Sequence, residues 1–143
     1  MEPLDQPPPS RMPGPGVAVL CEATPERLTE VHAALGRFWQ RLDTPPPEEW
    51  TMLFELAVSE VAANIVEHAR PQVMHMRLTL DAGNVVAEFT DTGQGWSGPP
   101  EPAGMIDELA ERGRGLSLAM TAVDDVVYER EGSTNRWRLV KRL

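Results

Sequence analysis

The stretch of sequence that decides the fold is residues 56–69, which read LAVSEVAANIVEHA. Apolar residues recur in it at three- and four-residue spacing, which predicts an amphipathic helix packed against a sheet. Glu60 and Asn64 are four residues apart, so they project from one helix face, on the flank of the apolar stripe. An acid and an amide placed in this way form either a simple hydrogen-bonded helix pair or part of a polar site at the edge of the core.

Two glycine motifs further along the chain favour a site. Residues 91–95 read DTGQG and close a strand-like run, and residues 113–116 read GRGL and begin an apolar helical pattern. Residues 93–98 also spell the dinucleotide-binding pattern G-x-G-x-x-G. That pattern must open a helix, but Pro99 and Pro100 follow it here, so we reject a dinucleotide site.

The composition excludes several classes of function. A chain of 143 residues with a formal charge of -9 is one domain without the basic surface that binds nucleic acid. Its single cysteine, Cys21, excludes an internal disulfide and a cysteine-based zinc site, and we expect it in the core. The only lysine, Lys141, lies in a strand pattern, whereas Walker A loops and eukaryotic-type kinases need a lysine at the phosphates.

The order of elements predicts the fold class. Residues 1–15 are proline-rich and are expected to form a flexible tail, and residues 16–143 form the domain. The expected elements are strands at 16–22, 73–80, 85–90, 125–131 and 135–143, and helices at 24–42, 48–69 and 116–123, with Thr24 capping the first helix. This order predicts an α+β two-layer sandwich, with helices on one face of a mixed, mostly antiparallel sheet.

The sequence predicts neither a membrane-spanning segment nor a signal peptide. The sequence contains no run of about 18 apolar residues, so we expect no transmembrane helix. Prolines occupy the region where a signal peptide would need an apolar stretch, so we expect a cytoplasmic protein.

Together the three motifs resemble the N, G1 and G2 boxes of the GHKL (histidine-kinase-like) ATPases. The residues of these motifs are similar to those of the RsbW/SpoIIAB-type anti-sigma factor kinases, and the resemblance covers roughly residues 16–143. The resemblance implies the Bergerat fold, with the proline- and glycine-rich residues 96–112 as a lid over the nucleotide, and ATP and Mg²⁺ as cofactors.

The resemblance also assigns roles to individual residues. Asp91 accepts a hydrogen bond from the adenine amino group, and Gly93 and Gly95 let the backbone pass close to the nucleotide. Asn64 is the Mg²⁺ ligand, an oxygen donor suited to a metal that takes its other ligands from phosphate and water. Glu60 is the catalytic carboxylate that orients a serine hydroxyl or water near the γ-phosphate.

Two further contacts to the nucleotide are expected. Gly113 and Gly115 precede a helix, so backbone N–H groups and the positive helix end would face the triphosphate, and Arg114 is a further phosphate contact or a solvent-facing arginine. Thr134, or Ser133 beside it, places a hydroxyl near Asp91 or simply forms a turn.

The function that the resemblance implies is partner switching. Such a protein binds a sigma factor, transfers the γ-phosphate of ATP to a serine or threonine of a STAS-domain anti-anti-sigma factor, and is typically a homodimer. Two alternatives stay open: a switch kinase of a STAS scaffold that never binds sigma, and a non-catalytic nucleotide-binding adaptor. A retired site has no physical reason to retain both Glu60 and Asn64, which argues against the adaptor.

Overall fold

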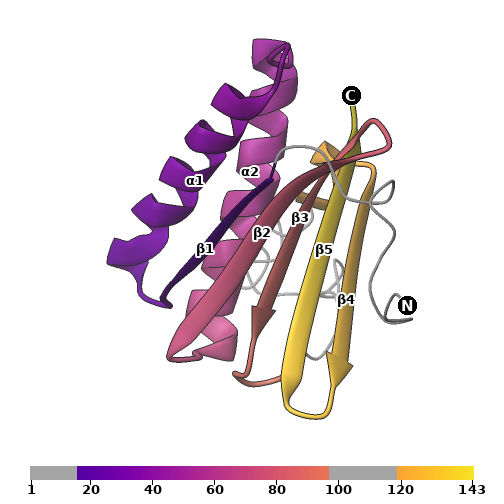
Figure 1. The fold of residues 1–143 in the computed structure, drawn as a ribbon. Coiled ribbons are helices and arrows are strands. Elements are labelled where there is room, and N and C mark those ends of the chain that lie inside the picture. Colours follow the sequence, from indigo (N-terminus) through magenta and orange to yellow (C-terminus); the bar gives the residue numbers. More distant parts are fainter. Residues whose placement is uncertain (1–15, 97–118) are drawn as a thin grey trace, which may run out of the picture.

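The computed structural model describes residues 16–96 and 119–143, which form two layers. One layer is a sheet of strands in the order β1-β2-β3-β5-β4. The strands are β1 (Gly16–Glu22), β2 (Val73–Asp81), β3 (Asn84–Asp91), β4 (Asp125–Glu131) and β5 (Thr134–Arg142). Helices α1 (Leu28–Arg41) and α2 (Glu48–Asn64) cover one face of it (Figure 1). The predicted α+β sandwich is confirmed, but all four strand pairings described are antiparallel, so the expected mixed sheet is wrong in that detail.

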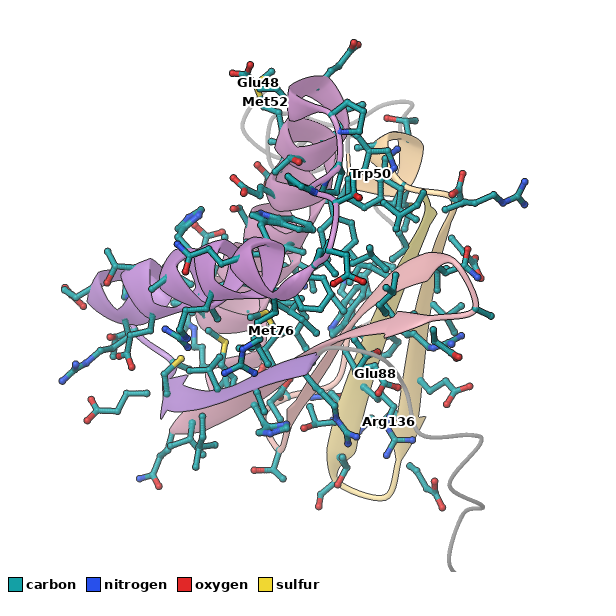
Figure 2. The ribbon with its side chains drawn as sticks, turned by 45° about the horizontal axis from the view of Figure 1, so that its top comes forward. Glu48, Trp50, Met52, Met76, Glu88 and Arg136 are labelled. Atoms are coloured by element: carbon teal, nitrogen blue, oxygen red, sulfur yellow. The ribbon has the colours of Figure 1, made fainter. Side chains whose placement is uncertain are left out.

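The alternation of side chains along the strands separates the two sheet faces. In β2 the residues Met74, Met76 and Leu78 are buried beneath the helices. Figure 2 shows Met76 on the helix side, and Glu88 and Arg136 on the opposite face of the sheet. The predicted period of two in this strand is therefore confirmed, because the helices cover only one face.

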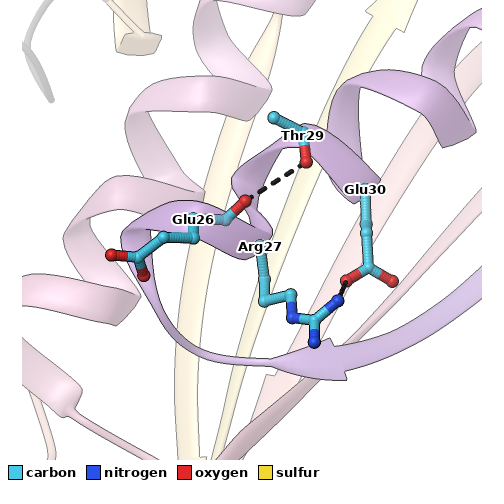
Figure 3. Close-up of polar contacts among 4 residues, drawn as sticks. All are labelled: Glu26, Arg27, Thr29 and Glu30. Carbon is cyan, nitrogen blue, oxygen red and sulfur yellow. Dashed lines mark hydrogen bonds and ion pairs between the residues drawn. The ribbon is translucent and has the colours of Figure 1, made fainter.

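The first helix starts differently from the prediction. Thr24 is extended and its side chain makes no capping hydrogen bond. A 3₁₀ turn, Pro25–Arg27 (η2), comes before α1, and the Thr29 hydroxyl donates to the Glu26 carbonyl at 3.2 Å (Figure 3). The Arg27 guanidinium lies 3.3 Å from the Glu30 carboxylate in the same turn. The predicted Thr24 cap is wrong, because the tighter turn at Pro25 bonds through the backbone.

Aromatic side chains join the two helices to each other and to the sheet. Trp39 of α1 donates its indole N–H to the Glu55 carboxylate of α2 at 2.7 Å. Trp39 also packs edge-on against Trp50 and Phe54, with ring centroids 5.9 and 5.8 Å away. Trp50 faces the sheet, as Figure 2 shows, and its indole N–H donates to the Arg142 carbonyl at 2.8 Å. The first turn of α2 is therefore tied to the last strand.

The end of the second helix is the main departure from the predicted elements. The α-helix ends at Asn64, and Ile65–Ala69 (η3) forms one π-helical turn that closes with a hydrogen bond from the Arg70 N–H to the Ile65 carbonyl at 2.9 Å. Arg70 then takes a left-handed conformation, with φ at 51°. The prediction of a helix that continues in the same form to Ala69 is therefore wrong. The wider turn presents the Ala69 carbonyl to the loop after β3, whose Gln94 N–H donates to it at 2.8 Å.

Candidate functional site

The centre of the site is the carboxylate of Asp91, the last residue of β3. Asp91 is only 5% exposed. Its Oδ1 accepts hydrogen bonds from the Gly93 N–H at 2.8 Å and from the Asn135 Nδ2 at 2.9 Å. Its Oδ2 is buried and has no partner within residues 16–96 and 119–143. Because an unsatisfied buried carboxylate oxygen is costly, this atom is a candidate acceptor for a donor supplied by a ligand.

Both glycines of the turn after Asp91 have close neighbours, and the approach to rigid backbone explains the first of them, Gly93. A Cβ at Gly93 would overlap the backbone carbonyl of Ala69, at the end of the π turn. A Cβ at Gly95 would lie 3.0 Å from the Cδ of Arg130. The turn is therefore pressed between the end of the α2 segment on one side and β4 on the other, and a side chain at Gly93 would separate them.

A buried amide on β5 holds this turn in place. Asn135 is 1% exposed and lies directly opposite Asp91 in the β3–β5 register. Besides its bond to Asp91, its Nδ2 lies 3.2 and 3.0 Å from the carbonyl oxygens of Gly93 and Gln94. The acid and both carbonyls of the turn thus converge on one side chain.

Two residues of β4 contact the other end of that amide. The Tyr128 hydroxyl donates to the Asn135 Oδ1 at 2.5 Å, and the Arg130 guanidinium donates to the same atom at 2.7 Å and to the Gly93 carbonyl at 3.0 Å. The Tyr128 hydroxyl also accepts the Trp96 N–H at 2.9 Å. The hydrogen-bonded chain therefore runs from the end of the turn to the carboxylate.

Glu60 and Asn64 lie half-buried on α2, on the flank turned away from α1. Ser59 marks the opposite flank, because its hydroxyl lies 3.5 Å from the ring of His32 on α1. Asn64 is the last α-helical residue before the π turn that ends at Ala69, where the turn after β3 makes contact. The C-terminal ends of α2 and β3 therefore meet at one edge of the molecule (Figure 1).

Thr134 is not among the described residues that hydrogen-bond to Asp91. It begins β5 and pairs with Glu131, and strand alternation directs it to the face opposite Asn135. There it lines a hollow of about 310 Å³ together with Glu129, Glu131 and Arg136. Ser133 lies exposed in the turn before it.

Three of the predicted site residues, Gly113, Arg114 and Gly115, lie outside the described residues, as do the expected tail at 1–15 and nearly all of the expected lid. Within residues 16–96 and 119–143, no three His, Cys, Asp or Glu side chains cluster closely enough to hold a metal ion by themselves.

Sequence reasoning missed Asn135, Tyr128 and Arg130. A signal for them was present, because a hairpin closing at residues 132 and 133 pairs Arg130 with Asn135. Asn135 also shares its alternation with Trp137 and Leu139, both buried, so it is a polar residue at an inward-facing position. Such a residue must find partners, and the acid of the neighbouring strand is one.

The arrangement defines a class of site: an α+β sandwich in which an acidic, glycine-containing turn meets the end of a helix that carries an acid and an amide. Residues 21–141 match the family model of the histidine kinase-like ATPase domain, and the chain belongs to this family. The GHKL assignment made from the three motifs is therefore confirmed.

Solved structures share the fold. The crystal structure of the RsbU and RsbW domains of Rv1364c from Mycobacterium tuberculosis aligns with a TM-score of 0.68 at 22% identity, over 92% of this chain and 32% of that one. The Acinetobacter baumannii histidine kinase AdeS aligns with a TM-score of 0.52 at 14% identity, over 87% of this chain and 66% of that one. The chain thus spans about a third of the first of these proteins.

Two further findings concern curated relatives and membrane-spanning helices. No protein with a curated function matches the sequence significantly. None of the helices within residues 16–96 and 119–143 is both long and apolar enough to cross a bilayer.

Proposed function

We propose that this domain is an ATP-dependent serine/threonine protein kinase of a partner-switching module. In this proposal it binds Mg-ATP, phosphorylates a STAS-domain anti-anti-sigma factor, and holds a sigma factor inactive, as a homodimer. The observation that carries the proposal is the buried, unpaired Oδ2 of Asp91 in a glycine turn that abuts the end of α2. Membership in the histidine kinase-like ATPase family supports ATP as the ligand.

The residues present fit an adenine nucleotide. A purine 6-amino group is a neutral donor, and Asp91 offers it one free acceptor oxygen in a buried position. Asn64 would contribute a neutral oxygen to a Mg²⁺ that is otherwise held by phosphates and water. Gly113, Arg114 and Gly115 are proposed to hold the triphosphate through backbone N–H groups and a guanidinium.

Glu60 is the proposed catalytic residue. Its carboxylate, half-buried one turn before Asn64, would accept a hydrogen bond from the attacking serine or threonine hydroxyl and orient it in line with the γ-phosphorus. The hydroxyl oxygen forms the new bond to phosphorus as the bond to the bridging oxygen of ADP breaks. The hydroxyl proton passes to the carboxylate.

The proposed partners rest on the resemblance to RsbW-type kinases and on the fold shared with a structure that contains an RsbW domain. A switch kinase that phosphorylates a STAS scaffold without binding sigma is the second candidate. Capture of a sigma factor by the purified protein separates the two: phosphorylation of a STAS protein without any capture favours the scaffold kinase.

The decisive experiment is phosphate transfer from radiolabelled ATP to candidate STAS proteins of the same genome, followed by identification of phosphoserine or phosphothreonine. Glu60→Ala is expected to retain ATP binding and to lose transfer by about 10²-fold or more. Glu67→Ala is the matched control, because Glu67 is an exposed glutamate in the π turn that follows α2. Unchanged transfer by Glu60→Ala would remove the catalytic role of Glu60.

A second variant tests the nucleotide site itself. Asp91→Asn replaces the proposed acceptor with an amide and should weaken ATP binding by about tenfold or more, because a hydrogen bond to a charged group is lost. Asp81→Asn, at the exposed end of β2, is the control and should leave the affinity unchanged. Equal ATP affinity of both variants, measured by calorimetry, would contradict the adenine role of Asp91.

A further inference from the structure

Asn135 is buried, and each polar atom of its side chain has a protein hydrogen-bond partner. The Oδ1 receives two donors, from Tyr128 and Arg130, and the Nδ2 faces three acceptors, on Asp91, Gly93 and Gln94. Rotating the amide by 180° would place its NH₂ against the Arg130 guanidinium, which can only donate, and its oxygen against three acceptors. The surroundings therefore allow only one orientation of this amide.

That orientation decides which oxygen of Asp91 is free. The Asn135 Nδ2 and the Gly93 N–H both bind Oδ1, and no described residue binds Oδ2. A carboxylate held at one oxygen by two donors cannot rotate without breaking both hydrogen bonds. The free oxygen is thus held in one direction before any ligand arrives.

We infer that Asn135 is a positioning residue that orients the Asp91 carboxylate, so that its Oδ2 selects a nucleobase carrying an exocyclic amino group. Tyr128 and Arg130 keep Asn135 in the required orientation. The inference rests on the proposed function, because it concerns how the same site distinguishes nucleotides. It adds a specificity determinant 44 residues from Asp91 in sequence.

The position of Tyr128 strengthens this role. Its ring packs against Trp96 and Trp137, with centroid distances of 5.3 and 4.8 Å. Its hydroxyl bridges the Trp96 N–H and the Asn135 Oδ1. The ring is thus held by packing against two tryptophans that also contact each other, and the hydroxyl can be removed without removing the ring.

A purely structural role for Asn135 predicts a different result from a positioning role. If Asn135 only stabilises the turn, its loss weakens the binding of all nucleotides alike. If it orients Oδ2, its loss weakens only ligands that carry the amino group. The test therefore compares ATP with purine riboside 5′-triphosphate, which has hydrogen in place of the 6-amino group.

Isothermal titration of the whole chain with each nucleotide measures this difference. Asn135→Ala should lower ATP affinity about tenfold and the affinity for purine riboside 5′-triphosphate less than twofold. Tyr128→Phe, which retains the packed ring, should show the same selectivity with a smaller loss, about two- to fivefold, since Arg130 still holds the amide. It keeps the test decisive should Asn135→Ala fail to fold.

Arg136→Gln is the control on the same hairpin, because Arg136 lies next to Asn135 but on the opposite face of the sheet. It should change neither affinity. Equal losses for both nucleotides in Asn135→Ala and Tyr128→Phe would overturn the inference, as would a wild-type protein that does not prefer ATP over the analogue. A wild-type protein that binds neither nucleotide would instead overturn the proposed function.

Discussion

Gly93 and Gly36 differ in the room that the surrounding structure leaves for a side chain. A Cβ at Gly93 would overlap the Ala69 carbonyl, whereas one at Gly36, within α1, meets no atom within 4 Å. The constraint at Gly93 is thus a contact between distant segments, and Gly36 only lowers the helix propensity of α1.

Substitution with alanine separates these two cases. Gly93→Ala should lower the free energy of unfolding by about 2 kcal/mol or more, because the turn must move away from Ala69 and its hydrogen bond to Gln94 is lost. Gly36→Ala should raise it by about 0.5–1 kcal/mol. Urea unfolding monitored by tryptophan fluorescence measures both. A stable Gly93→Ala protein would show that the turn is not pressed against α2.

Cys21 links burial to the pH dependence of stability. Burial in β1 raises the pKa of its thiol above the ordinary value of 9.0, and Glu30 adds to the increase while Arg27 opposes it. Above pH 9 the thiol of the unfolded chain ionises before that of the folded chain. The contribution of the thiol to stability is therefore complete below this pH and is lost as the pH rises through the folded pKa.

The prediction concerns the difference between two proteins. The wild-type free energy of unfolding should decline more steeply between pH 8 and pH 10 than that of Cys21→Ala, in which no thiol titrates. Urea unfolding at several pH values measures both slopes, and other titrating groups cancel in the comparison. Parallel curves would contradict a raised thiol pKa.

At the scale of elements, the β2–β3 hairpin contains a backbone conformation that its sequence suits only in part. Ala82 and Gly83 have φ angles of 53° and 83°, so both central residues of the turn are left-handed. This is the pattern of a type I′ turn, in which asparagine is favoured at the first position and alanine is strained.

Ala82→Asn should therefore raise the free energy of unfolding by about 0.5–1 kcal/mol. The same substitution at Ala33, an exposed residue of α1, should lower it by about 0.5 kcal/mol, because asparagine is a poorer helix former than alanine. Thermal unfolding of the two variants measures the contrast. No gain at Ala82 would contradict a left-handed conformation at that position, whereas a gain at Ala33 would contradict the helix-propensity argument for the control.

At the scale of the whole molecule, the only lysine joins distant parts of the chain. The Lys141 ammonium donates to the Ala122 carbonyl at 2.9 Å, at the end of the short helical stretch 119–122, and lies 5.6 Å from the ring centroid of Trp50. The expectation that this lysine lies in the last strand is met.

Lys141→Met should lower the free energy of unfolding by about 1–2 kcal/mol and leave ATP affinity unchanged. Arg138→Met, an exposed cation of the same strand, should change stability by less than about 0.5 kcal/mol. Calorimetric titration and thermal unfolding of the same preparations measure both properties. A large loss of ATP affinity in Lys141→Met, with the fold intact, would place the lysine in the nucleotide site.

The local patterns of the sequence predicted much of this architecture. The apolar spacing in α1 and α2 involves residues only a few positions apart in the sequence, and so does the alternation in β2. Such patterns can therefore be recognised without a structure. The three motifs identified the ATPase family for the same reason, since each is a short run of residues. The roles proposed for Glu60, Asn64 and Asp91 still depend on experiment.

The tertiary structure decided what depends on contacts between distant segments. The π turn before Arg70, the requirement for glycine at position 93 and the placement of Asn135 rather than Thr134 beside Asp91 arise from strand register and from the meeting of α2 with the loop after β3. A one-residue change of register exchanges the two faces of a strand, and helical or strand periodicity alone does not specify how two strands align. The sequence by itself therefore determined the family and the order of elements, whereas the packed sheet decided which side chains surround the free carboxylate oxygen.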